Sequence, residues 1–133
     1  MQGGELPEAV RRFIIEHIES VEQLEILLLL FRRQDQVWSA EGVARELRIS
    51  ELSAGERLVD LNQDGLVVRV HDGAAETYRY SARDAQLDES VRGLVAAYAE
   101  RRVTVINLIF SKPTDKIRTF ANAFRFWNGG ERE

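Results

Sequence analysis

The chain has 133 residues, a formal net charge of −4, 44% apolar residues and 30% charged residues, which is the balance of an ordinary globular domain. It contains no cysteine, so disulfides and cysteine-ligated metals are excluded. The N-terminus lacks the basic and apolar stretches of a signal peptide, and the longest apolar run is too short to cross a bilayer. We therefore expect a cytoplasmic protein with no membrane contact.

Two helices are predicted at the start of the chain. Pro7 suits the first turn of a helix that runs to about His17 or Glu19. Ser20 is expected to cap the second helix, with Gln23 completing a capping box. Residues 21–33 are apolar on nearly every face, which predicts the buried central helix of the domain.

A pair of short helices follows a β-prone segment at Val37 and Trp38. Ser39 is expected to cap the first of the pair, which runs through Leu47. The second covers about residues 52–64, with Ser53 and Glu56 read as a capping box, and stops at Gly65.

A hairpin is predicted next, with strands at residues 66–71 and 77–80 around a loop at 72–76 that contains Asp-Gly. In the expected register His71 faces Thr77 and Arg69 faces Arg79. These four side chains would share one face of the hairpin, opposite Val68, Val70, Tyr78 and Tyr80.

A long helix is expected from Asp84 to about residue 110, although the β-branched segment 103–110 is also compatible with a strand. Its apolar residues form a heptad seam that begins with Leu87, Val91, Leu94 and Tyr98. This seam could contact a second copy of the chain or pack on the chain's own central helix. Thr114 is expected to cap a last helix whose aromatic stripe would need a partner surface, namely Phe120, Phe124 and Trp127.

This order of elements predicts a mainly α fold with a small β-hairpin: a winged helix-turn-helix core plus long C-terminal helices. We expect one domain over residues 1–133, with the core at about 20–80 and a C-terminal helical region for dimerisation or packing at about 84–127.

The sequence also resembles the bacterial winged-helix regulators of the MarR-like type. The resemblance rests on Val37-Trp38-Ser39, on the apolar positions of the two short helices, on the phrase Asp64-Gly65-Leu66-Val67 after a leucine-rich helix, and on Tyr78-Arg79-Tyr80. It implies a DNA-binding transcriptional regulator, with double-stranded DNA as partner and a homodimer as the working form. By position it implies DNA contacts from the second short helix, the turn before it and the hairpin, through Arg45, Arg48, Ser53, Arg57, Gln63, Arg69, His71 and Arg79.

Acidic charge on the second short helix points to a different partner. The helix carries Glu56, Asp60 and Asp64 against Arg57, and carboxylates oppose phosphates. Residues 91–127, in contrast, carry seven cations against two carboxylates. Two hypotheses therefore stand: a dimeric DNA-binding regulator, or a winged helix that contacts a protein partner and does not use its acidic helix on DNA.

Nothing in the sequence indicates an enzyme, a cofactor or a metal site. His17 and His71 lie in separate elements without a metal-ligand neighbour at helical spacing. The glycines do not form a phosphate-binding loop, and no serine sits in a nucleophile elbow.

Overall fold

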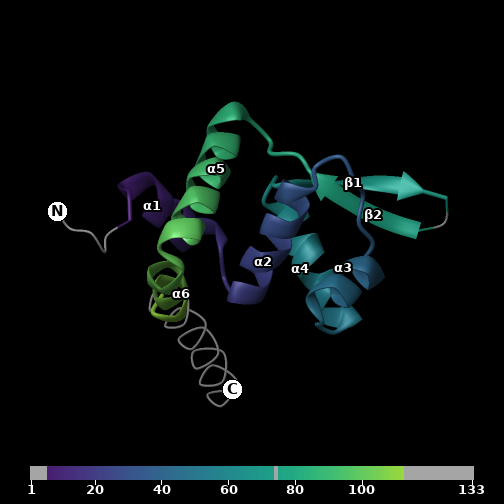
Figure 1. Cartoon of the computed structure of the whole chain (residues 1–133). Helices are drawn as coiled ribbons and strands as arrows, with labels where there is room; N and C mark the ends of the chain where they lie inside the picture. The colour runs from purple at the N-terminus through teal and green to yellow at the C-terminus, as the bar shows by residue number, and fades with distance from the viewer. Residues whose placement is uncertain (1–5, 74, 113–133) are drawn as a thin grey trace, which may run out of the picture.

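The computed structural model describes residues 6–73 and 75–112, and its elements follow the predicted order (Figure 1). Helices α1 (Glu8–His17) and α2 (Val21–Arg32) precede the helix pair α3 (Ala40–Leu47) and α4 (Glu51–Gln63). Strands β1 (Val67–Asp72) and β2 (Ala75–Tyr80) form the hairpin, and helices α5 (Ala85–Glu100) and α6 (Arg102–Phe110) complete the described chain.

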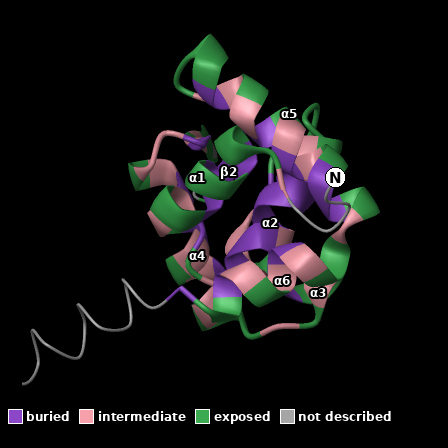
Figure 2. Ribbon diagram, turned by 90° about the vertical axis from the view of Figure 1, so that its left-hand side faces the viewer, coloured by how far each residue is buried: buried purple, intermediate pink, exposed green. Residues whose placement is uncertain are grey.

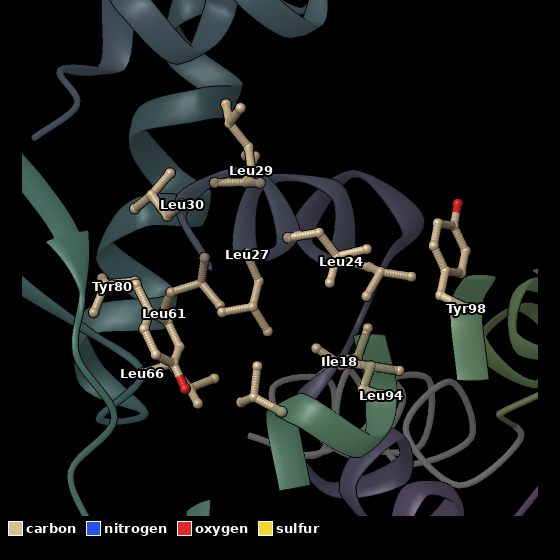
Figure 3. Close-up of a cluster of buried hydrophobic side chains, with 14 of the residues drawn as sticks. Ile18, Leu24, Leu27, Leu29, Leu30, Leu61, Leu66, Tyr80, Leu94 and Tyr98 are labelled. Carbon is tan, nitrogen blue, oxygen red and sulfur yellow. The ribbon is translucent and has the colours of Figure 1, made fainter. Parts of the chain in front are cut away.

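Helix α2 is the central helix, as predicted, and most of it is buried (Figure 2). Figure 3 shows its leucines between two sets of side chains. Leu61, Leu66 and Tyr80 come from α4 and the hairpin, whereas Ile18, Leu94 and Tyr98 come from the linker after α1 and from α5. Because α2 is apolar on nearly all faces, it can bury against both sets at once.

The helix starts mostly follow the predicted caps. The Ser20 hydroxyl accepts from the Gln23 amide at 3.0 Å, and the Ser39 hydroxyl accepts from the Gly42 amide at 3.0 Å. The predicted cap at Ser53 is wrong, because Ser50 caps α4 and accepts from the Ser53 amide at 3.0 Å. Ser50 has the extended backbone that a cap needs, whereas Ser53 already lies within the first turn.

The predicted hairpin register is also wrong. Asp72 pairs with Ala75, so the loop comprises residues 73 and 74 and is shorter than expected. Arg69 therefore faces Tyr78, His71 faces Glu76, and Arg79 faces Val68. The cause is the loop length, which sets the register of a hairpin, and a shift of one residue moves a side chain to the other face.

The hairpin is attached to the helices at both ends. Trp38 forms the predicted short β contact, exchanging two backbone hydrogen bonds of 2.7 and 2.8 Å with Tyr78. Gly65 ends α4 with a φ of +81°, a left-handed conformation that glycine adopts readily, and turns the chain into β1.

The predicted long C-terminal helix is two helices. It breaks at Arg101, whose φ of −135° and ψ of 54° are not helical, and α6 then begins. Residues 103–110 lie in α6, so the strand alternative is wrong. Helix α5 packs along α1, with α6 at its end (Figure 1).

Candidate nucleic-acid interface

Helices α3 and α4 form the helix-turn-helix, and α4 presents one side to the outside. Its inward side carries Ala54, Leu58 and Leu61, all fully buried. The opposite side carries Leu52, Glu56, Val59 and Gln63, which we call the outer ridge of α4. Leu52 is 73% exposed and Val59 is 36% exposed. In a helix-turn-helix this ridge is the part that reaches a DNA groove.

Ser53 and Arg57 were predicted to face a groove, but both are turned toward α2. The Ser53 hydroxyl donates to the Glu22 carboxylate, and the Arg57 guanidinium lies 3.8 Å from the same carboxylate. Arg57 also donates to Asp60 Oδ2 at 3.2 and 3.3 Å. The single cation of α4 is thus matched by two carboxylates. Of the three predicted groove residues, only Gln63 lies on the outer ridge.

Arg45 and Arg48 lie at the end of α3, beside the turn that leads to α4. Arg45 is exposed and donates to Glu41 Oε2 at 2.9 Å, one helical turn earlier. Arg48 is exposed and ends α3 in the left-handed conformation, with a φ of 61°. The ion pair of Arg45 is exposed, so it holds this side chain only weakly.

The hairpin cations do not form one patch. Arg69 and His71 share a face with Tyr78, whereas Arg79 lies on the other face beside Val68. The Arg69 guanidinium lies 3.7 Å from Glu76 and 5.9 Å from the Tyr78 ring centroid. The side chains of Arg69, His71 and Arg79 are all exposed. Because they lie on two faces of the hairpin, a flat surface can contact only one of the two groups at a time.

A polar cluster fixes the base of the hairpin to α5. The Tyr80 hydroxyl donates to Asp88 Oδ1 at 2.7 Å, and Arg92 Nε donates to Asp88 Oδ2 at 2.8 Å. Burial, and then the hydrogen bond to Asp88, raises the pKa of the Tyr80 hydroxyl well above its ordinary value. The Tyr80 and Arg92 hydrogen bonds lower the pKa of Asp88. The Phe31 ring of α2 meets the Tyr80 ring edge-on at 5.0 Å.

Two further polar contacts connect the winged helix to the flanking helices. His17 Nδ1 of α1 lies 3.2 Å from Asp64 Oδ2 at the end of α4. The Tyr98 hydroxyl of α5 donates to Glu25 Oε2 of α2 at 2.9 Å. Burial, and then the hydrogen bond to Glu25, raises the pKa of the Tyr98 hydroxyl. The orientation of α4 and the wing is therefore tied to α1 and α5.

The predicted dimerisation seam is corrected in part. Leu87, Val91, Leu94 and Tyr98 are buried within the chain itself, against α1 and α2, so they do not offer a surface to a second copy. This is the alternative that the heptad pattern left open, because an amphipathic stripe packs equally well on its own chain. The aromatic stripe of Phe120, Phe124 and Trp127 lies outside the described residues.

An apolar strip on α6 is exposed instead. Val103 is 68% exposed and Phe110 is 63% exposed, and the partly buried Ile106 lies between them at helical spacing. We call Val103, Ile106 and Phe110 the α6 strip. Sequence reasoning missed it because six of the nine residues of α6 are apolar and their spacing does not mark one side of the helix as buried.

Sequence reasoning also missed the carboxylates that form ion pairs with Arg57 and Arg69. Glu22 lies on another helix from Arg57, and no spacing rule relates residues that meet only through tertiary packing. The contact between Arg69 and Glu76 could have been predicted if the hairpin loop had been taken as shorter. The shorter loop pairs Glu76 with His71, on the face of the hairpin that carries Arg69.

Other kinds of site find no support in residues 6–73 and 75–112. No group of three or more acidic or histidine side chains could hold a metal ion there. In the same part of the chain, no helix has both the length and the apolar character to cross a membrane.

These elements define a class of fold: a helix-turn-helix followed by a β-hairpin wing, carried on a central helix and flanked by additional helices. Two solved structures resemble the chain. A point mutant of S. aureus MepR bound to an oligodeoxyribonucleotide has a TM-score of 0.55 and 14% identity, over 90% of this chain and 86% of that one. A MarR family protein from Bacillus stearothermophilus has a TM-score of 0.48 and 15% identity, over 93% of this chain and 83% of that one.

The chain therefore shares the winged-helix fold of this MepR mutant, and a winged helix is the fold that the order of its elements predicted. Neither protein-family models nor curated protein sequences give a match to this sequence.

Proposed function

We propose that the protein is a DNA-binding transcriptional regulator that works as a homodimer. The observation that carries this proposal is the fold: an exposed second helix of a helix-turn-helix beside a hairpin, arranged as in a MepR mutant bound to an oligodeoxyribonucleotide. In such an arrangement α4 enters the major groove and the wing lies against the backbone.

The DNA contacts would be divided between the turn and the wing. Arg45 and Arg48 lie beside the start of α4, where a helix-turn-helix approaches phosphates. Arg69 and His71 on one face of the wing, or Arg79 on the other, would add backbone contacts. Gln63 and Glu56 on the outer ridge would meet base edges, because an amide suits adenine and a carboxylate accepts from cytosine.

A dimer would compensate for this modest set of cations. A dimer presents two α4 helices to the DNA. When both helices bind one duplex, the overall affinity is much higher than that of either helix alone. The exposed side of α6 supports the proposal, because Val103, an apolar side chain that is 68% exposed, favours burial against a second copy.

The central test is DNA binding across a salt series, with random-sequence and genomic duplexes. Replacing Arg69 and Arg79 with alanine should weaken binding to all sequences alike and lower the salt slope by about one for each lost contact. The matched control replaces Arg11 and Arg12, two exposed arginines on α1, and should leave the slope unchanged. A wild-type protein that binds no duplex even at about 50 mM salt would contradict the regulator proposal.

A second candidate function, a protein-contact module, is favoured by one observation: the outer ridge of α4 carries no cation. Glu56→Gln with Asp60→Asn separates the two functions by sign. For a regulator this change should strengthen non-specific DNA binding, because it removes two repulsive charges, one of which is a carboxylate paired with Arg57. For a protein-contact module it should slow association with a basic partner.

The control for this pair is Glu89→Gln with Glu100→Gln, which makes the same charge change at two exposed positions of α5. Stronger DNA binding by the control variant would show that net charge alone is responsible and would remove the argument for the ridge.

A further inference from the structure

A groove of about 670 Å³ runs between the outer side of α4 and strand β2 of the wing. Its floor is apolar and comes from three elements: Ala40 at the start of α3, Leu52, Gly55 and Val59 on α4, and Tyr78 on β2. Leu52 contributes nothing to the core, since 73% of it is exposed. An exposed leucine that lines an apolar groove is a feature of recognition surfaces.

The rim of this groove is acidic. Glu51, Glu56, Asp60 and Glu76 line it, and none of the lining residues in the described chain is a cation. Asp60 is matched by Arg57 and Glu76 by Arg69, both from outside the groove. Glu51 and Glu56 are exposed and have no ion pair within the described chain. Two carboxylates are therefore available to an incoming cation.

This combination does not suit a nucleic acid. The groove lies between the two parts of a winged helix that face DNA, and its carboxylates would oppose the phosphate backbone. An apolar floor offers a phosphate no hydrogen bond. A polypeptide with apolar side chains and flanking cations satisfies both features, because it covers the floor and pairs with the rim.

We propose that the groove between α4 and β2 docks a basic segment of a separate protein. The segment would place large apolar side chains on Leu52, Val59 and Tyr78, and lysine or arginine side chains against Glu51 and Glu56. This inference deepens the protein-contact candidate and names its site and the chemistry of its partner. Because Glu56 and Val59 belong to the outer ridge, an occupied groove also hides the part of α4 that would reach DNA.

The test uses the full chain and three synthetic peptides of 14 residues. The first carries leucines at helical spacing with lysines elsewhere, the second replaces the lysines with glutamates, and the third replaces the leucines with serines. Backbone amide resonances are followed during each titration. We expect the Leu/Lys peptide to bind saturably and to shift resonances of α4 and β2, and the other two to bind at least tenfold more weakly. Equal binding of the Leu/Glu peptide would overturn the proposal.

Matched variants locate the site. Leu52→Ser with Val59→Ser removes two exposed apolar side chains from the floor, and should weaken the Leu/Lys peptide at least tenfold. Ile15→Ser with Val37→Ser removes two exposed apolar side chains elsewhere, and should leave its affinity unchanged. Equal losses in the two variants, or shifts that fall on α6 instead of α4, would overturn the proposal. The thermal unfolding midpoint of each variant shows that it is folded. Glu56→Gln tests the rim separately, because it removes a carboxylate proposed to pair with the lysines of the peptide.

Two further experiments test whether the chain itself occupies the groove and whether the docking site and the DNA-binding function stand independently. A peptide of residues 113–128 that shifts the same α4 and β2 resonances more tightly than the Leu/Lys peptide would make the chain itself the occupant, and would overturn a separate partner. A labelled duplex is then titrated with and without the Leu/Lys peptide. DNA binding with no peptide binding removes only the docking site, whereas peptide binding with no DNA binding removes only the regulator.

Discussion

At the scale of single residues, Asp88 links the hairpin to α5. It accepts from Tyr80 of the wing and from Arg92 of its own helix. The Arg92 guanidinium also lies 5.8 Å from the Phe31 ring centroid, so residues from α2, β2 and α5 meet at this point. A change at Asp88 therefore tests whether the wing is anchored by this cluster.

Asp88→Asn should lower the free energy of unfolding at pH 7 by about 1 kcal/mol, because the amide still accepts from Tyr80 but loses the charge opposite Arg92. The folded-state pKa of Asp88 lies below its ordinary value, so the stabilisation is present above about pH 4 and is lost as the pH falls through the folded pKa. Urea unfolding from pH 7 downward should therefore show the two proteins converging in acid.

The control is Asp35→Asn, which makes the same charge change at an exposed aspartate after α2 and should match the wild type at pH 7. A gap between Asp88→Asn and the wild type that persists undiminished in strong acid would show that the cluster acts by shape and not by charge.

At the scale of elements, the contact between α1 and α5 depends on the absence of a side chain at Gly93. A Cβ at this position would lie 3.1 Å from Val10 Cγ2, whereas a Cβ at Gly55 of α4 would meet Ala40 Cβ at an ordinary 3.7 Å. Both glycines lie inside helices, where alanine is preferred by roughly 0.5–1 kcal/mol. The two positions thus share the propensity gain and differ in the space available.

Gly55→Ala should raise the free energy of unfolding by about 0.5–1 kcal/mol. Gly93→Ala should give no gain or a loss, because Val10 is β-branched and has one preferred rotamer in a helix, so it cannot turn away. Adding Val10→Ala to Gly93→Ala should couple favourably in a double-mutant cycle measured by urea unfolding. Full additivity of the two changes would mean that α1 simply shifts to make room.

Lys112 joins the ends of α1 and α6. Its ammonium group donates to the backbone oxygen of Ile18 at 2.6 Å and to that of Ile14 at 3.4 Å. Both carbonyl groups lie at the end of α1, which carries partial negative charge, and the Ile14 oxygen also accepts from the Ile18 backbone N–H at 3.0 Å. The flanking helices are thus held together by a capping contact as well as by apolar packing.

At the scale of the whole molecule, the proposed dimer needs an apolar surface that the chain does not cover itself. The seam of α5 does not serve, since it is buried, and we place the proposed contact at Val103 of α6, which is 68% exposed. A second copy that packs on this side of α6 would give a dimer that carries two winged helices.

Val103→Asp should shift the protein from dimer to monomer, because the change places a charge in the proposed contact. Light scattering after size-exclusion chromatography measures the mass directly. The control is Leu52→Asp, which changes the most exposed apolar side chain of the winged helix and should leave the mass unchanged. A wild-type protein that is monomeric at high micromolar concentration would contradict the homodimer itself.

Local signals determined much of the fold. The caps at Ser20 and Ser39, the apolar faces of α2 and the stop at Gly65 each depend on residues close together in the chain, and each was predictable. The order of these elements was enough to predict a winged helix, because turn residues and periodicity act over one or two helical turns.

Tertiary structure decided the character of the site. The sequence alone placed Arg57 on the exposed face of its helix, but packing against α2 set it between Glu22 and Asp60. Loop length, which depends on a difference of one or two residues, separated Arg79 from Arg69 and His71. The heptad seam predicted which side of α5 is buried. Only the tertiary positions of α1 and α2 show that this side packs on the same chain and not on a second copy. Periodicity specifies which side of an element is buried, and the three-dimensional arrangement alone specifies its neighbour.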